Sequence, residues 1–149
     1  MARQLIVRNI DEGLVRALKT RATRHGRSAE AEHAGVRAWF EEADEASLYT
    51  SVLVVGELRR GIESLRRRDA PSALALEQWL DGITGGFADR ILAVDRAVAE
   101  QWGRLNVPDP IPTVDGLLAA TSIVHGMTLV TRNTKDVART GAPLLDPTA

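Results

Sequence analysis

The segment from Thr113 to Asp136, TVDGLLAATSIVHGMTLVTRNTKD, carries three oxygen-bearing side chains that could share one site. Asp115 stands at the start of an apolar helical stretch, and Asn133 and Asp136 come after the buried strand pattern MTLV. Carboxylate and amide oxygens are the ligands that hard divalent cations such as Mg²⁺ prefer. Three such groups are only part of a metal site, so the remaining ligands must be sought elsewhere in the chain.

The composition sets limits on the class of protein. With 149 residues, of which 44% are hydrophobic, the chain can form one ordinary domain or two small ones around a real core. The absence of cysteine excludes disulfides and thiolate metal sites, and it suits a cytoplasmic location. The longest apolar run covers only a few residues around Val52 to Val55, so we expect neither a signal peptide nor a membrane span.

The net charge of −1 hides an uneven distribution. Residues 1–33 hold seven Arg or Lys against four Asp or Glu, whereas residues 34–149 hold twelve against sixteen. A basic head on a mildly acidic body points weakly to nucleic acid as a partner. The alternative is a solvated helix face with no ligand.

The head itself has the pattern of a strand followed by two helices. Residues 3–10 alternate in the period of a strand, and residues 11–26 and 28–43 have helical apolar stripes separated by a Gly-Arg-Ser turn. Such a short unit has too little core to stand alone. It therefore predicts a homodimer, joined through residues 3–9 as an antiparallel two-stranded ribbon that covers Leu5 and Val7.

Beyond Asp44 short strands alternate with helices, which predicts right-handed crossovers and a parallel sheet. The expected strands are 47–51, 90–95, 127–133 and 142–147, and the expected helices are 52–68, 72–83, 96–105, 114–126 and 134–140.

The stretch QLIVRNIDEGLVRALKTRATRHGRSAEAEH resembles the ribbon-helix-helix unit of VapB-type and FitA-type antitoxins. The resemblance implies operator DNA as a partner, with Gln4, Ile6 and Arg8 on the strand face that reads base edges. Arg27 and Ser28, at the start of the second helix, would face a phosphate. Ile6 departs from the pattern, since an apolar side chain can contact only a thymine methyl, and the alternative for Gln4 and Arg8 is a solvated strand.

The stretches VRAWFEEADEASLYTSVLVVGELRRGI, RILAVDRAVAEQWGRL and TVDGLLAATSIVHGMTLVTRNTKDVARTGAPLLDP resemble a VapC-type PIN domain. Members of that family are Mg²⁺- or Mn²⁺-dependent ribonucleases with a cluster of carboxylates. The resemblance implies that Glu57 and Asp115 are two of the site's acids. Asn133 stands where a further ligand often lies, and Asp136 follows three residues later.

The first acid of that family is missing. Its members open with a strand ending in an Asp, of the form LLDTN, whose following helix leads into VRAWL; here the head runs directly into Val36. We therefore expect a ribbon-helix-helix unit over residues 1–35, followed over 36–149 by an α/β PIN-like parallel sheet without its first strand. Alternatively QLIVRNI fills the vacant place, which puts Val7 where the Asp belongs.

These expectations describe a toxin–antitoxin chimera that binds operator DNA and carries an incomplete nuclease site, with Mg²⁺ or Mn²⁺ held weakly if at all. The alternative is an active metal-dependent ribonuclease. Oligomers beyond the dimer and RNA as a partner remain open.

Overall fold

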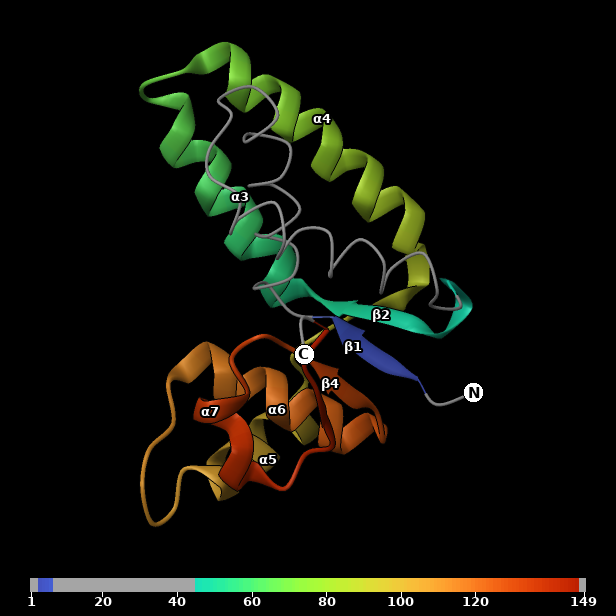
Figure 1. Cartoon of the computed structure of the whole chain (residues 1–149), viewed down its shortest axis with the longest axis vertical. Coiled ribbons are helices and arrows are strands. Elements are labelled where there is room, and N and C mark those ends of the chain that lie inside the picture. The colour runs from blue at the N-terminus through green and yellow to red at the C-terminus, as the bar shows by residue number, and fades with distance from the viewer. Residues whose placement is uncertain (1–2, 7–44, 148–149) are drawn as a thin grey trace.

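The computed structural model describes residues 3–6 and 45–147 (Figure 1). The two helices expected over 11–26 and 28–43 lie outside the described residues. Element labels follow Figure 1.

A five-stranded parallel sheet in the order β3-β2-β1-β4-β5 organises the structure. Every neighbouring pair runs parallel, as the alternation of strands and helices predicts. The expected α/β architecture with a parallel sheet is thus confirmed. The strands are β1 (Gln4–Ile6), β2 (Leu48–Ser51), β3 (Ile91–Leu92), β4 (Thr128–Val130) and β5 (Leu144–Leu145).

The N-terminal strand β1 occupies the centre of this sheet, which is the second of the two expected outcomes. Gln4 is in register with Leu48 on one side and Thr128 on the other, and Leu5 is fully buried. A strand between β2 and β4 stabilises the sheet, because unpaired buried N–H and C=O groups each cost about 1–3 kcal/mol. The antiparallel ribbon expected over residues 3–9 is not what this structure contains, because residues 4–6 already pair on both edges within one chain; residues 7–9 are not described.

Arg3 fixes the start of β1 against both neighbouring strands. Its carbonyl accepts a hydrogen bond from the Thr128 N–H at 3.0 Å, and its guanidinium lies 5.7 Å from the centroid of the Tyr49 ring. The same guanidinium donates to the carbonyl of His125. These contacts tie the strand to β2 on one side and to the segment before β4 on the other.

Helices cover both sides of the sheet. Figure 1 shows α3 and α4 on one side of β1 and β2, with α5, α6 and α7 on the other. Side-chain caps begin three of them: Ser51 accepts from the Leu53 N–H, Asp69 from Ser72 and Asp95 from Val98. The helices are α3 (Val52–Arg66), α4 (Ala70–Phe87), α5 (Arg96–Leu105), α6 (Thr113–His125) and α7 (Thr134–Val137), with 3-10 turns at Glu45–Ser47, Ala88–Arg90 and Ala138–Thr140.

The core lies between these layers and passes through β1. The buried stripe of α3 and that of α4 pack together, and Leu5 belongs to the same cluster as Leu118 of α6 and Leu129 of β4. Among the described helices, none is long and apolar enough to cross a membrane.

Gln4 is poorly satisfied in this position. Its Oε1 atom is buried and has no hydrogen-bond partner among the described residues. We expect Gln4→Met, which keeps the shape and removes the amide, to raise the free energy of unfolding by about 1 kcal/mol. Urea unfolding measures this change, with the exposed Gln78→Met as a control expected to stay within about 0.5 kcal/mol. A loss of stability in Gln4→Met would show that the amide is satisfied after all.

Candidate functional site

The site lies at the edge of the sheet where the parallel strands end. Because the strands run in one direction, the ends of β1, β2 and β4 meet at this edge, as the pairing of Ile6 with Val130 shows. Ser51 ends β2 and caps α3, and Thr131 follows β4; both are buried. Crevices outside the carboxyl ends of such strands are where open α/β sheets bind ligands.

Three of the four predicted site residues come together here. The Nδ2 of Asn133 donates to Asp115 Oδ2 at 3.3 Å and to Asp136 Oδ2 at 2.8 Å, while the Asn133 N–H donates to Thr131 Oγ1 at 3.0 Å. Asp115 is only 8% exposed, in the first turn of α6. An acid there is favoured by the positive end of the helix dipole.

Glu57, the fourth predicted residue, lies half-buried in α3. Figure 1 shows α3 on the opposite side of the strands from α6 and α7. A site made from all four residues would therefore span the end of the sheet, with β1 running between its two sides.

Of the residues predicted to read DNA, Gln4 lies partly buried in β1, and Ile6 is the last residue of that strand. Arg8, Arg27 and Ser28 lie outside the described residues.

The oxygen-bearing side chains that meet among the described residues do not make a complete divalent-metal centre. In the described ranges, no three Asp, Glu, His or Cys side chains converge. Asp115 and Asp136 instead receive hydrogen bonds from one amide nitrogen, which already partners their oxygens. The residue that follows β1 in the sequence is Val7, whose side chain carries no oxygen.

Trp102 packs beside the site and was not among the predicted site residues. A Cβ added to Gly116 would lie 3.2 Å from Trp102 Cδ1, so the indole packs directly on the helix turn that carries Asp115. The side chain of Asn106 donates to the Trp102 carbonyl at 2.7 Å and accepts from the Ile111 N–H at 2.9 Å. Only the glycine beside Asp115 marked this packing in the sequence.

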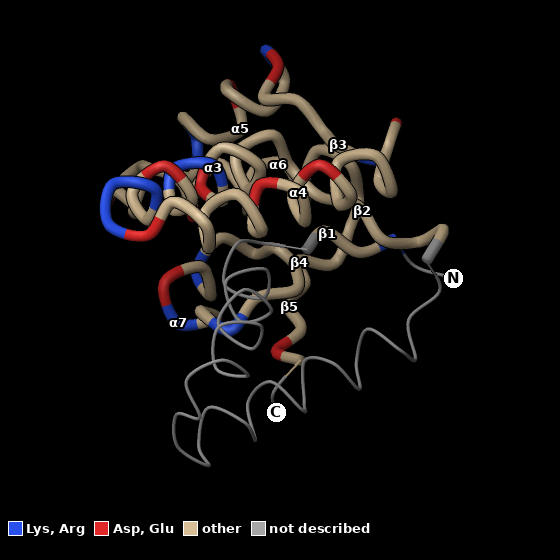
Figure 2. The backbone as a smooth tube through the Cα atoms, turned by 90° about the horizontal axis from the view of Figure 1, so that it is seen from above, with Lys and Arg blue, Asp and Glu red and all other residues tan. Residues whose placement is uncertain are grey.

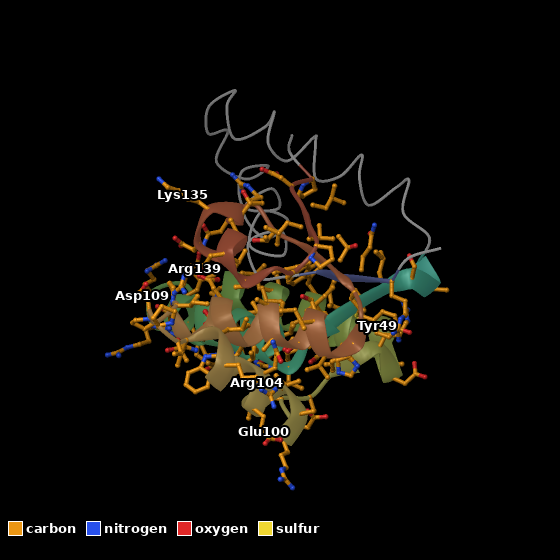
Figure 3. The ribbon with its side chains drawn as sticks, turned by 90° about the horizontal axis from the view of Figure 1, so that it is seen from below. Tyr49, Glu100, Arg104, Asp109, Lys135 and Arg139 are labelled. Atoms are coloured by element: carbon orange, nitrogen blue, oxygen red, sulfur yellow. The ribbon has the colours of Figure 1, made fainter. Side chains whose placement is uncertain are left out.

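The loop before α6 is also held from the other side. Arg139 donates to the carbonyls of Asp109 and Pro110, the latter at 2.8 Å. Arg139 and Asp109 can be followed in Figure 3. The segment after α7 thus positions the approach to Asp115.

Charged side chains at the far end of the α3–α4 pair bind one another. Figure 2 shows acidic and basic residues side by side there. Arg66 donates two bonds to Glu63, at 3.0 and 3.1 Å, and both Arg66 and Arg59 donate to Glu77. The hydrogen bond from Arg66 is the main cause that lowers the pKa of Glu63. Arg59, close to Glu57 in the sequence, is therefore engaged within the protein.

We expect Asn133→Asp to lower the free energy of unfolding at pH 7 by about 1–3 kcal/mol, because it places a third carboxylate between two others. Asn133→Ala, which removes the amide without adding charge, should cost less. Urea unfolding at low salt compares the two. Millimolar Mg²⁺ should restore part of the stability of Asn133→Asp and change the unsubstituted protein little; equal losses in both variants would mean that the three groups are not in contact.

Relatives of known type match both parts of the chain. Residues 4–43 match the family described as antitoxin FitA-like, ribbon-helix-helix. The toxin FitB of Neisseria gonorrhoeae is 32% identical over an alignment of 104 residues that covers 66% of this chain and 74% of FitB. The VapC ribonuclease Y4jK of Sinorhizobium fredii is 28% identical over 75% of this chain and 83% of its own.

Solved structures agree with the fold. A chain of FitAcB from Neisseria gonorrhoeae superposes with a TM-score of 0.81 at 25% identity, covering 97% of both chains. A chain of VapBC2 from Rickettsia felis, bound to a DNA fragment from its promoter, superposes with a TM-score of 0.62 at 19% identity, covering 95% of this chain and 96% of that chain. Together with the identity to FitB and the ribbon-helix-helix match, these likenesses show that the chain belongs to the VapBC/FitAB family of toxin–antitoxin proteins.

Proposed function

We propose that this chain is a DNA-binding protein that carries an impaired nuclease body. Residues 1–35 bind operator DNA as a dimer, and residues 36–149 form the PIN-like remainder. The observation that carries the proposal is the match of residues 4–43 to a ribbon-helix-helix antitoxin family. Proteins that use a two-stranded ribbon place it in the major groove, where alternate side chains contact base edges.

Two further observations support DNA as the partner. The structure of FitAB bound to the IR36 DNA fragment and that of VapBC2 bound to promoter DNA are among the proteins that share this fold. The head also carries an excess of basic residues over acidic ones, which favours the phosphate backbone. In this proposal Gln4, Ile6 and Arg8 read bases, and Arg27 and Ser28 contact phosphate.

Impairment of the nuclease is supported by the composition of the site. The resemblance to a PIN domain puts the first acid of the site at the position of Val7, whose side chain carries no oxygen. A divalent ion loses affinity when one carboxylate is missing, because both the charge and the geometry of the remaining oxygens are poorer. Any Mg²⁺ or Mn²⁺ would be held chiefly by Glu57 and Asp115, and weakly.

The alternative is an active Mg²⁺- or Mn²⁺-dependent ribonuclease acting on RNA. It is favoured by one specific observation, the grouping of Asp115, Asn133 and Asp136 at the carboxyl edge of the sheet.

We expect Arg8→Ala to weaken binding to the DNA that lies upstream of this reading frame by about 1–3 kcal/mol, the value of a bidentate guanine contact. Gel shifts across a salt series measure the affinity. Arg68→Ala, at an exposed position after α3, is the matched control and should bind as the unsubstituted protein does. Equal affinity of Arg8→Ala and the unsubstituted protein would show that Arg8 does not contact bases. If the unsubstituted protein bound no DNA at all, the proposed function would be wrong.

RNA incubated with the purified chain and millimolar Mg²⁺ or Mn²⁺ should remain intact. Val7→Asp, which supplies the missing acid, should gain metal-dependent cleavage, whereas Val7→Asn, of similar shape but uncharged, should not. Cleavage by the unsubstituted chain that is lost in Asp115→Asn would establish the ribonuclease alternative. Gel electrophoresis of labelled RNA distinguishes these outcomes.

A further inference from the structure

Two different strand pairings involve β1. In this structure Gln4–Ile6 pair with β2 along one edge and with β4 along the other. The same residues begin the segment that matches a ribbon-helix-helix family. A ribbon to which each chain contributes one strand requires a second copy of the chain, so the two pairings use different partners.

The two pairings cannot coexist in one chain. A strand has only two edges, and both edges of β1 are taken by parallel neighbours. Leu5 is also fully buried between the helical layers, where a second chain has no access to it. An antiparallel ribbon through these residues therefore needs β1 to leave its place between β2 and β4.

We propose that operator DNA binding and the closed five-stranded sheet exclude each other, so that the DNA-bound dimer holds each PIN-like body with β1 withdrawn. This inference rests on the proposed DNA-binding function and adds a conformational condition to it. DNA that binds only the open form shifts the population toward that form, and by linkage every interaction that stabilises the closed form weakens DNA binding by the same factor.

Features of β1 itself favour such an exchange. The strand is only three residues long, so few ladder hydrogen bonds must be broken to release it. The buried Oε1 of Gln4 finds no partner among the described residues, whereas on a ribbon surface the same amide would meet water or a base. The closed sheet thus holds a polar side chain that the alternative pairing serves better.

Amide hydrogen exchange along β4 tests the proposal residue by residue, in the full chain. The Thr128 N–H donates to Arg3 and so faces β1, whereas the N–H groups of Leu129 and Thr131 donate to Pro143 and Leu145 and face β5. Saturation with the upstream DNA should accelerate exchange at Thr128 by about tenfold or more, with Leu129 and Thr131 changed by less than about twofold. The last two amides are controls on the same strand.

The outcomes separate the inference from the function on which it rests. If the gel shift shows specific DNA binding while exchange at Thr128 stays the same, or rises equally at all three amides, the exclusion is wrong and the DNA-binding function stands. If no DNA binds, both fail together.

A substitution outside the matched segment gives an independent test. Tyr49 of β2 contacts the Arg3 guanidinium. Tyr49→Leu therefore weakens the attachment of β1 to β2 and leaves the sequence of residues 4–43 unchanged. Its DNA affinity should rise about two- to fivefold, the ratio that corresponds to an exposed cation–π contact. Leu74→Ala on α4, at a position that is 50% exposed and outside the core cluster of Leu5, is the control and should leave the affinity unchanged. An unaltered or lower affinity for Tyr49→Leu would overturn the proposal.

Discussion

The pairing of β1 between β2 and β4 is the interaction on which the rest of the structure depends. Without it the sheet would fall into two pairs, β3 with β2 and β4 with β5. The α3–α4 pair packs on β2, and α6 packs on β4, so each half has its own helices. Leu5, the fully buried residue at the middle of β1, joins the two halves of the core. Three residues at one end of the chain therefore convert two partial layers into one domain.

The central position of β1 also determines which residues can belong to the candidate site. Because β1 is central, its carboxyl end points to the same edge as Thr131 and the start of α6, which is where the acids gather. The segment that supplies the strand comes from an antitoxin-like head, however, and its next residue is a valine. The strand completes the backbone pairing of the sheet, and the residue that follows it carries no carboxylate. Backbone hydrogen bonds are nearly independent of side-chain identity, whereas metal binding is not.

The segment that matches the antitoxin family and the parallel sheet share strand β1. One segment matches an antitoxin family, and the chain as a whole superposes on a chain of FitAcB from Neisseria gonorrhoeae. In this structure β1, at the start of the matched segment, pairs with β2 and β4. The buried Oε1 atom of Gln4 lies within this sheet without a hydrogen-bond partner among the described residues.

Much of the body could be predicted from the sequence, because its elements depend on local patterns. The period of the apolar residues placed α3 and α5 within a few residues, and Gly126, with φ of 64°, ends α6 as a left-handed glycine should. Helix α4 runs on past the expected end at residue 83 to Phe87, through two glycines that tertiary packing tolerates.

The resemblance to a PIN domain implied that Asp115 and Asn133 belong to one site, and the structure brings them together with Asp136. Which partner β1 takes did not follow from the sequence, since its alternating pattern satisfies a ribbon and a buried sheet equally well. The tertiary structure decides the partners of β1. Unpaired backbone groups between β2 and β4 cost free energy only once the other strands have assembled.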